Sequence, residues 1–183
     1  MVYEGPVRRG PKRRNMLAET RLLAEYLVER YPGAEVHVRF RVGADPEIVG
    51  VTLESEEERR FARNFNRWAD ALVVLPTELV LIEATMWRAT EKVGRLQEYL
   101  ILAQATPELA QYRGRPLRAE LLTAQHDTVA EELCRRLGFR YTHYEPSWMP
   151  EFLAAYPDRR RRTPHAGMVA AAAEAESRAP TVE

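Results

Sequence analysis

The sequence predicts an α/β fold with a mixed central sheet, helices on its faces and extended tails at both ends. Residues 35–42 alternate between apolar and polar side chains, which is the period of a half-buried strand. Residues 70–75 and 79–85 are short apolar runs on either side of Pro76-Thr77-Glu78, a pattern typical of an antiparallel hairpin. After residue 85, helical and strand periods alternate, which favours strands joined by helical crossovers.

The composition is that of one folded unit. The chain has 183 residues, 45% of them hydrophobic, and 27 basic side chains balance 27 acidic ones. No stretch approaches the ~18 consecutive apolar residues of a membrane-spanning helix, and the N-terminal residues are too charged for a signal peptide. We therefore expect a cytoplasmic protein without membrane contact. The single cysteine, Cys134, excludes an internal disulfide framework and a zinc site built from several cysteines.

The first half of the chain is interpreted as an arm, a helix and strands. Residues 1–15 contain two Gly-Pro breaks and no apolar period, so they are predicted to form a basic N-terminal arm. The arm carries the basic residues Arg8, Arg9, Lys12, Arg13 and Arg14. A helix is predicted from Met16 to Pro32-Gly33. Residues 48–53 are a candidate hairpin partner for strand 35–42.

A capping box and alternating elements follow. Ser55 and Glu58 match a capping box that opens a helix toward Trp68. The later elements are predicted to be a helix from Thr90 to near Pro107, a strand at 117–124, a helix at 129–137, a strand at 139–145 and a short helix at 149–156. Asp127 is the expected N-cap of the second of these helices, and Gly138 its C-cap.

The C-terminal residues 158–183 are rich in Arg, Pro and Ala and cannot bury a core. They are interpreted as a tail. The folded α/β domain is therefore predicted over residues 16–157.

Asp70 and Glu83 are the carboxylate pair that the predicted hairpin brings together. If Leu75 pairs with Glu78, Asp70 lies opposite Glu83; in the other register that the turn allows, Glu83 is its diagonal neighbour. Both registers place the two acids on one face. Opposite side chains have Cβ atoms about 5 Å apart, so two carboxylates there could share one divalent cation such as Mg²⁺.

With this pair in place, residues 16–146 resemble the PD-(D/E)XK nuclease-like superfamily, which includes restriction enzymes, Holliday-junction resolvases and many phage nucleases. Asp70 stands where the first acid of the family's motif stands. Glu83, in the run Leu81-Ile82-Glu83-Ala84-Thr85, stands where the second acid stands. The resemblance implies a restriction-endonuclease-like core and a phosphodiesterase that cuts DNA, with Mg²⁺ held by Asp70 and Glu83.

One position departs from the family's pattern. The motif lysine, expected two residues after Glu83, is Thr85. Lys92 or Arg88 could reach back from the start of the next helix to supply the missing positive charge, and Gln97 could resemble a glutamine that lines some sites of the family. Without such a substitute the site would be inactive, because a neutral hydroxyl cannot stabilise charge on a phosphate.

A structural interpretation also stays open for Asp70 and Glu83. Asp70 can simply begin a strand while Glu83 pairs with Arg67, Arg88 or Lys92. A third carboxylate is less expected, since the candidates Glu25 and Glu29 lie on a helix surface where glutamates are usually solvated.

If Asp70 and Glu83 have only these structural roles, the chain would be a catalytically inactive nuclease-fold protein. Its role would then be structural, such as that of a virion connector, or nucleic-acid binding. Its N- and C-terminal tails would contact protein partners in a homo-oligomer or larger assembly. In either interpretation the basic arm and Arg88 are the candidate contacts to DNA.

Overall fold

The computed structural model describes residues 11–44, 55–58 and 67–155, and the side chains only from residue 17 onward within the first range. The chain divides into two compact units, Met1–Glu145 and Pro146–Glu183, and the sheet belongs to the first. Several of our predictions lie outside what the structure describes: the strand at 48–53, the tail at 158–183, and the contacts of the basic side chains Arg8, Arg9, Lys12, Arg13 and Arg14.

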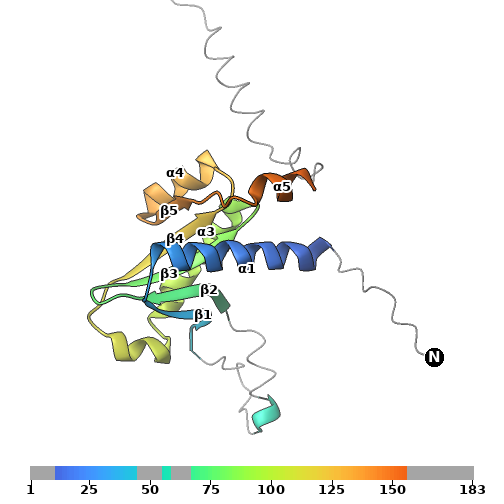
Figure 1. Ribbon diagram of the computed structural model, residues 1–183. Coiled ribbons are helices and arrows are strands. Elements are labelled where there is room, and N and C mark those ends of the chain that lie inside the picture. The colour runs from blue at the N-terminus through green and yellow to red at the C-terminus, as the bar shows by residue number, and fades with distance from the viewer. Residues whose placement is uncertain (1–10, 45–54, 59–66, 156–183) are drawn as a thin grey trace, which may run out of the picture. The chain divides into compact units, whose positions relative to one another are not determined.

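The centre of the first unit is a mixed sheet, as predicted, and it has five strands among the described residues. Its strands lie in chain order: β1 (Glu35–Val42), β2 (Arg67–Val74), β3 (Leu79–Thr85), β4 (Leu117–Thr123) and β5 (Arg140–His143). Strand β2 is antiparallel to both of its neighbours, β1 and β3, whereas β3, β4 and β5 are parallel (Figure 1). The parallel neighbours are joined by helical crossovers, α3 (Ala89–Ala103) between β3 and β4 and α4 (Thr128–Leu137) between β4 and β5.

Different helices cover the two faces of this sheet. Figure 1 shows α1 (Pro11–Arg30) lying across one face, with α3 (Ala89–Ala103) behind the sheet. The principal hydrophobic cluster joins α3 to the strands and includes Ala130 and Cys134 of α4 (Thr128–Leu137). The buried side chains of α1, such as Leu22 and Tyr26, are not part of that cluster. The sheet is therefore the middle layer between α1 and the pair α3 and α4.

Local sequence signals fix the ends of several elements. The Asp127 carboxylate accepts the backbone N–H groups of Val129 at 3.1 Å and Ala130 at 3.0 Å, which caps α4 as predicted. Gly138 ends the helix with a φ of 70°, a left-handed conformation that favours glycine. The capping box of Ser55 and Glu58 also forms, with both hydrogen bonds at 3.1 Å.

Helix α1 and strand β2 both begin earlier than predicted. Helix α1 begins at Pro11, not at Met16, because proline is well suited to the first position of a helix. The backbone of Lys12, Arg13 and Arg14 is thus helical and not part of an arm. Strand β2 begins at Arg67, since Arg67 and Trp68 pair with the end of β1; the helix predicted toward Trp68 does not reach it.

A short 3₁₀ helix, η2 (Pro107–Tyr112), was not predicted. The described part of the second unit contains α5 (Met149–Ala154), close to the predicted helix. Among the described residues, no helix has the length and apolar character needed to cross a membrane.

Candidate functional site

Asp70 and Glu83 come together where β2 and β3 separate. The backbone N–H of Leu75 donates to the carbonyl of Glu78 at 2.9 Å, which selects the first of the two predicted registers. The pairing runs from Val74 opposite Leu79 to Ala71 opposite Ile82, so the next pair in register would be Asp70 and Glu83. Instead, Asp70 Oδ2 accepts the backbone N–H of Ala84 at 2.9 Å. The side-chain carboxylate takes the place of a strand carbonyl at this point.

Lys92 of α3 completes the cluster. Its Nζ donates to Glu83 Oε2 and lies 3.4 Å from Asp70 Oδ2. The lysine side chain is 17% exposed and that of Glu83 only 1%. One ammonium therefore bridges two carboxylates in a setting where water screens their charges poorly.

Burial and neighbouring charge set the protonation of this cluster. Burial, reinforced by the charge of Asp70, raises the pKa of Glu83 to about 7, although Lys92 opposes the shift. Burial alone would lower the pKa of Lys92, but the carboxylates of Glu83 and Asp70 outweigh it and the pKa is raised. Glu83 thus changes charge near neutral pH while Lys92 keeps its proton.

One oxygen of Glu83 is left over. Glu83 Oε1 is buried and has no hydrogen-bond partner among the described residues. Burial, the charge of Glu83 and a weak hydrogen bond with Glu83 raise the pKa of the Tyr99 hydroxyl, whose well-formed hydrogen bond is the one it donates to the backbone carbonyl of Trp68 at 3.0 Å. A buried carboxylate oxygen that no donor reaches at full hydrogen-bond geometry is unusual in a protein interior.

Glu19 of α1 is a third acid near this pair, and the sequence analysis missed it. Its Oε1 accepts the backbone N–H of Met86 at 3.2 Å and lies 3.4 Å from the Thr85 hydroxyl oxygen. Burial raises the pKa of Glu19, which also senses the charges of Lys92 and Asp70. The signal was present in the sequence, because Glu19 is three and four residues before the buried Leu22 and Leu23 and so shares their helix face.

The two acids that we considered as third ligands lie elsewhere. Glu25 pairs with Arg21 at 2.7 Å on the surface of α1. Glu29 accepts the Tyr144 hydroxyl at 2.8 Å.

Thr85, at the position of the motif lysine, holds the turn after β3. It is buried, and its hydroxyl donates to the carbonyl of Trp87. The same oxygen accepts the Trp87 N–H at 3.0 Å. These bonds fix the chain between β3 and α3, from which Lys92 extends back to the acids.

Of the three proposed substitutes for the lysine, the structure brings only Lys92 to the acid pair. Arg88 is exposed and pairs with Glu91 at 3.3 Å. Gln97 is exposed on α3, five residues and thus about 140° around the helix from Lys92. Arg67, a possible partner of Glu83, pairs with Glu98 at 2.7 Å instead.

No protein-family model matches this chain, and no curated protein matches it significantly. Its function has to be argued from the geometry of the site.

The donor set fits a hard divalent cation in part. Asp70 and Glu83 converge on the Lys92 ammonium, and Glu83 Oε1 has no geometric hydrogen bond among the described residues. Carboxylate oxygens are the ligands that Mg²⁺ prefers, so an ion would bind beside Lys92. Within the described ranges no group of three or more His, Cys, Asp or Glu side chains is arranged to hold a metal. The protein ligands would therefore number two, with the rest of the coordination sphere left to water and phosphate, which is the usual situation for Mg²⁺.

Proposed function

We propose that this protein is a metal-dependent phosphodiesterase that cuts DNA. The observation that carries the proposal is that the Lys92 ammonium contacts the carboxylates of both Asp70 and Glu83. Two acids and one lysine in this arrangement match the chemistry implied by the resemblance to PD-(D/E)XK nucleases, with the lysine supplied by a helix in place of the strand.

Each residue has a role that follows from its surroundings. Asp70 and Glu83 would hold Mg²⁺, and the bound ion would supply an acidic water and charge neutralisation at the phosphate. Asp70 is fixed in orientation by the N–H of Ala84, which donates at 2.9 Å to Oδ2, the oxygen that also faces Lys92. Lys92 is the only side-chain ammonium described at the acids, and it would stabilise the negative charge that develops on the phosphate.

A catalytically inactive nuclease-fold protein is the second candidate. The contact between Lys92 and Glu83 also supports this candidate. The buried lysine already compensates the Glu83 charge, and such ion pairs can have a purely structural role. The tails that would contact assembly partners in that case lie mostly outside the described residues.

The two candidates differ in what happens when an acid is removed. We expect Asp70→Ala and Glu83→Ala to abolish Mg²⁺- or Mn²⁺-dependent cleavage of supercoiled, single-stranded or branched DNA. The matched control is Glu91→Ala, which removes an exposed acid of α3 and should leave cleavage unchanged.

Calorimetric titration with Mn²⁺ provides a second measurement. The wild type should bind one ion at the acid pair, and Glu83→Ala should lose that binding. A wild-type chain that neither binds Mn²⁺ nor cuts any of the three DNA forms would reject the enzyme and leave the structural candidate.

A further inference from the structure

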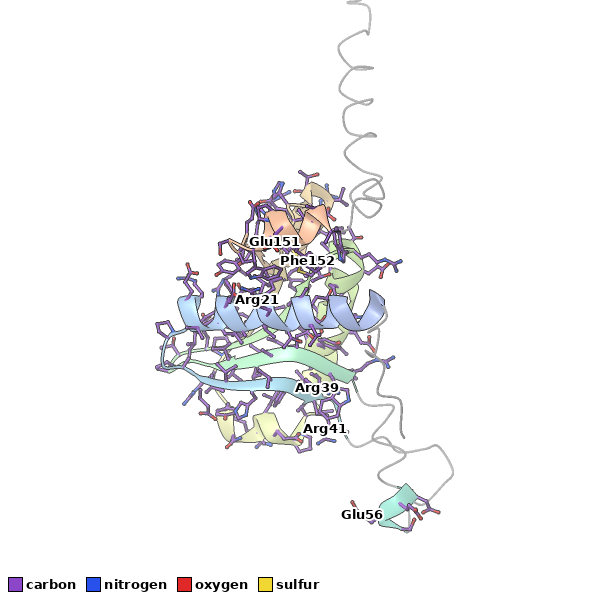
Figure 2. The ribbon with its side chains drawn as sticks, turned by 45° about the vertical axis from the view of Figure 1, so that its right-hand side comes forward. Arg21, Arg39, Arg41, Glu56, Glu151 and Phe152 are labelled. Carbon is purple, nitrogen blue, oxygen red and sulfur yellow. The ribbon has the colours of Figure 1, made fainter. Side chains whose placement is uncertain are left out.

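An exposed tryptophan lies beside the acid pair. Trp68 of β2 has a side chain that is 42% exposed, although large aromatic residues are usually buried. The guanidinium carbon of Arg39 on β1 lies 5.9 Å from the centroid of its ring. Figure 2 shows Arg39 and Arg41 on β1. Together Trp68 and Arg39 form an exposed aromatic and cationic surface, which we call the Trp68–Arg39 surface.

Among the described residues, Arg39 differs from the nearby Arg41 and Arg67 in that no acidic side chain pairs with it. Arg41 pairs with Glu108, and Arg67 pairs with Glu98. In the part of the chain that the structure describes, no carboxylate pairs with Arg39, which is exposed. Its charge is therefore available to an anion that approaches Trp68.

The backbone of Arg39 is also unusual. Its φ is 51°, in the left-handed region that a residue other than glycine rarely adopts. The conformation interrupts the regular alternation of β1 next to Trp68. Strained backbone of this kind is found more often at binding sites than elsewhere.

The Trp68–Arg39 surface is tied rigidly to the acid pair. Trp68 precedes Asp70 by two residues on β2, which corresponds to about 7 Å along a strand. Its backbone carbonyl accepts the hydroxyl of Tyr99, the residue whose pKa senses the Glu83 charge. A nucleotide whose phosphate lies at Asp70 would have a neighbouring base within reach of the indole.

We propose that Trp68 and Arg39 bind an unpaired nucleobase, so that the substrate of the acid pair is single-stranded nucleic acid. Aromatic side chains and arginine planes stack on the faces of bases that a duplex keeps inside. The positive charge of Arg39 complements the adjacent phosphates. This inference rests on the proposed function, because it names the substrate class of the same site.

Binding of a fluorescein-labelled single-stranded oligonucleotide to the full chain tests the proposal. The measurement is made in EDTA by fluorescence anisotropy, so it does not depend on metal or on cleavage. We expect Trp68→Ala to weaken binding roughly 5- to 150-fold, the range for loss of one base–aromatic stack, and Trp68→Phe to retain most of the affinity. The same strand annealed to its complement should bind more weakly than the single strand.

Two controls separate stacking from charge and from folding. Arg39→Ala should weaken binding, whereas Arg67→Ala, which removes an equal charge already paired with Glu98, should change it by less than Arg39→Ala does. On an oligonucleotide whose residues are all abasic, wild type and Trp68→Ala should bind equally.

The proposal is overturned if the wild type does not bind the single strand, or if Trp68→Ala leaves affinity unchanged. It is also overturned if Trp68→Ala lowers affinity equally for the normal and abasic strands. Loss of cleavage with intact base-dependent binding would reject the proposed phosphodiesterase and leave the Trp68–Arg39 surface standing.

Discussion

Lys92 and Glu83 form a buried ion pair between α3 and β3, and Asp70 is the second carboxylate within reach of the same ammonium. A buried pair of this kind costs desolvation on both sides, so its net contribution to stability is small, while loss of one partner is expensive. Substitutions in this pair should therefore affect both the free energy of unfolding and the rate of DNA cleavage, and the two can be measured separately.

Lys92→Met should destabilise the protein and abolish cleavage. The substitution leaves the Glu83 carboxylate buried without compensation, which typically costs about 3–5 kcal/mol. The loss should be smaller at pH 5 than at pH 8, because Glu83, with a pKa raised to about 7 by burial, can take up a proton at the lower pH. Urea unfolding at both pH values measures it. Arg88→Met, at an exposed site, should change stability by less than about 0.5 kcal/mol; an equal loss at both pH values for Lys92→Met would contradict this account.

Glu83 should make the folded protein less stable as the pH rises from about 4.5 to 7. Its pKa is raised from 4.5 to about 7, so the folded state keeps a proton that the unfolded state has released. The contribution of Glu83 to the free energy of unfolding is then fully present below pH 4.5. It decreases as the pH rises to about 7, the pKa in the folded state, by at most about 3 kcal/mol. Glu83→Gln should flatten the pH dependence of the unfolding free energy in this window.

The matched control for that pH dependence is Glu132→Gln. Hydrogen bonds from Arg135 and Arg136 lower the pKa of Glu132 to about 2, so its contribution changes only below pH 4.5. A wild-type curve that is flat between pH 4.5 and 7, or a Glu83→Gln curve with an unchanged slope, would show that Glu83 titrates normally.

Much of the sheet could be predicted because its signals are local. The alternation in residues 35–42 and the turn after Leu75 give β1 and β3 with the bounds that the structure has. The start of β2 could not be predicted in the same way. Arg67 and Trp68 have no strand pattern of their own, and they extend β2 because Val42 and Arg41 lie opposite them.

The acid pair could be predicted for the same reason, since one β-turn sets the register of Asp70 and Glu83. Lys92 was one of several candidates, and only the path of the chain after Thr85 decides among them. Glu19 depends on how α1 crosses the sheet. The pattern within α1 puts Glu19 on the buried face of the helix, but no pattern within β3 or α1 tells which strands that face meets.

Glu120 should be a larger determinant of stability than any surface acid. It is fully buried on the α1 side of β4 and accepts hydrogen bonds from Tyr26, Tyr31, Thr142 and Arg140. Burial, with the hydrogen bond to Glu120, raises the pKa of Tyr26 to about 12. Tyr31→Phe should cost about 1–3 kcal/mol, and Glu120→Ala more, because it leaves several buried donors without an acceptor.

Denaturant unfolding measures these losses, and Mn²⁺ titration provides the internal check. Glu120 is next to Leu121, which pairs with Glu83, so Glu120 and Glu83 point to opposite faces of the sheet. Tyr31→Phe should therefore leave metal affinity unchanged. A parallel loss of metal binding would mean that the two polar clusters are coupled through β3 and β4.

Thr85→Lys tests whether a lysine on β3 can replace Lys92 of α3 as the positive charge at the acid pair. By itself the substitution should lower stability, because Thr85 is 2% exposed and its hydroxyl bonds Trp87. In a Lys92→Met background, however, the new ammonium would be two residues from Glu83 on the same strand face, and close to Glu19. Thr85→Lys with Lys92→Met should then cut DNA at least about tenfold faster than Thr85→Met with Lys92→Met, equivalent to about 1.4 kcal/mol of transition-state stabilisation. Equal rates for the two double variants would mean that a charge at position 85 cannot replace Lys92, and that the lysine acts only from α3.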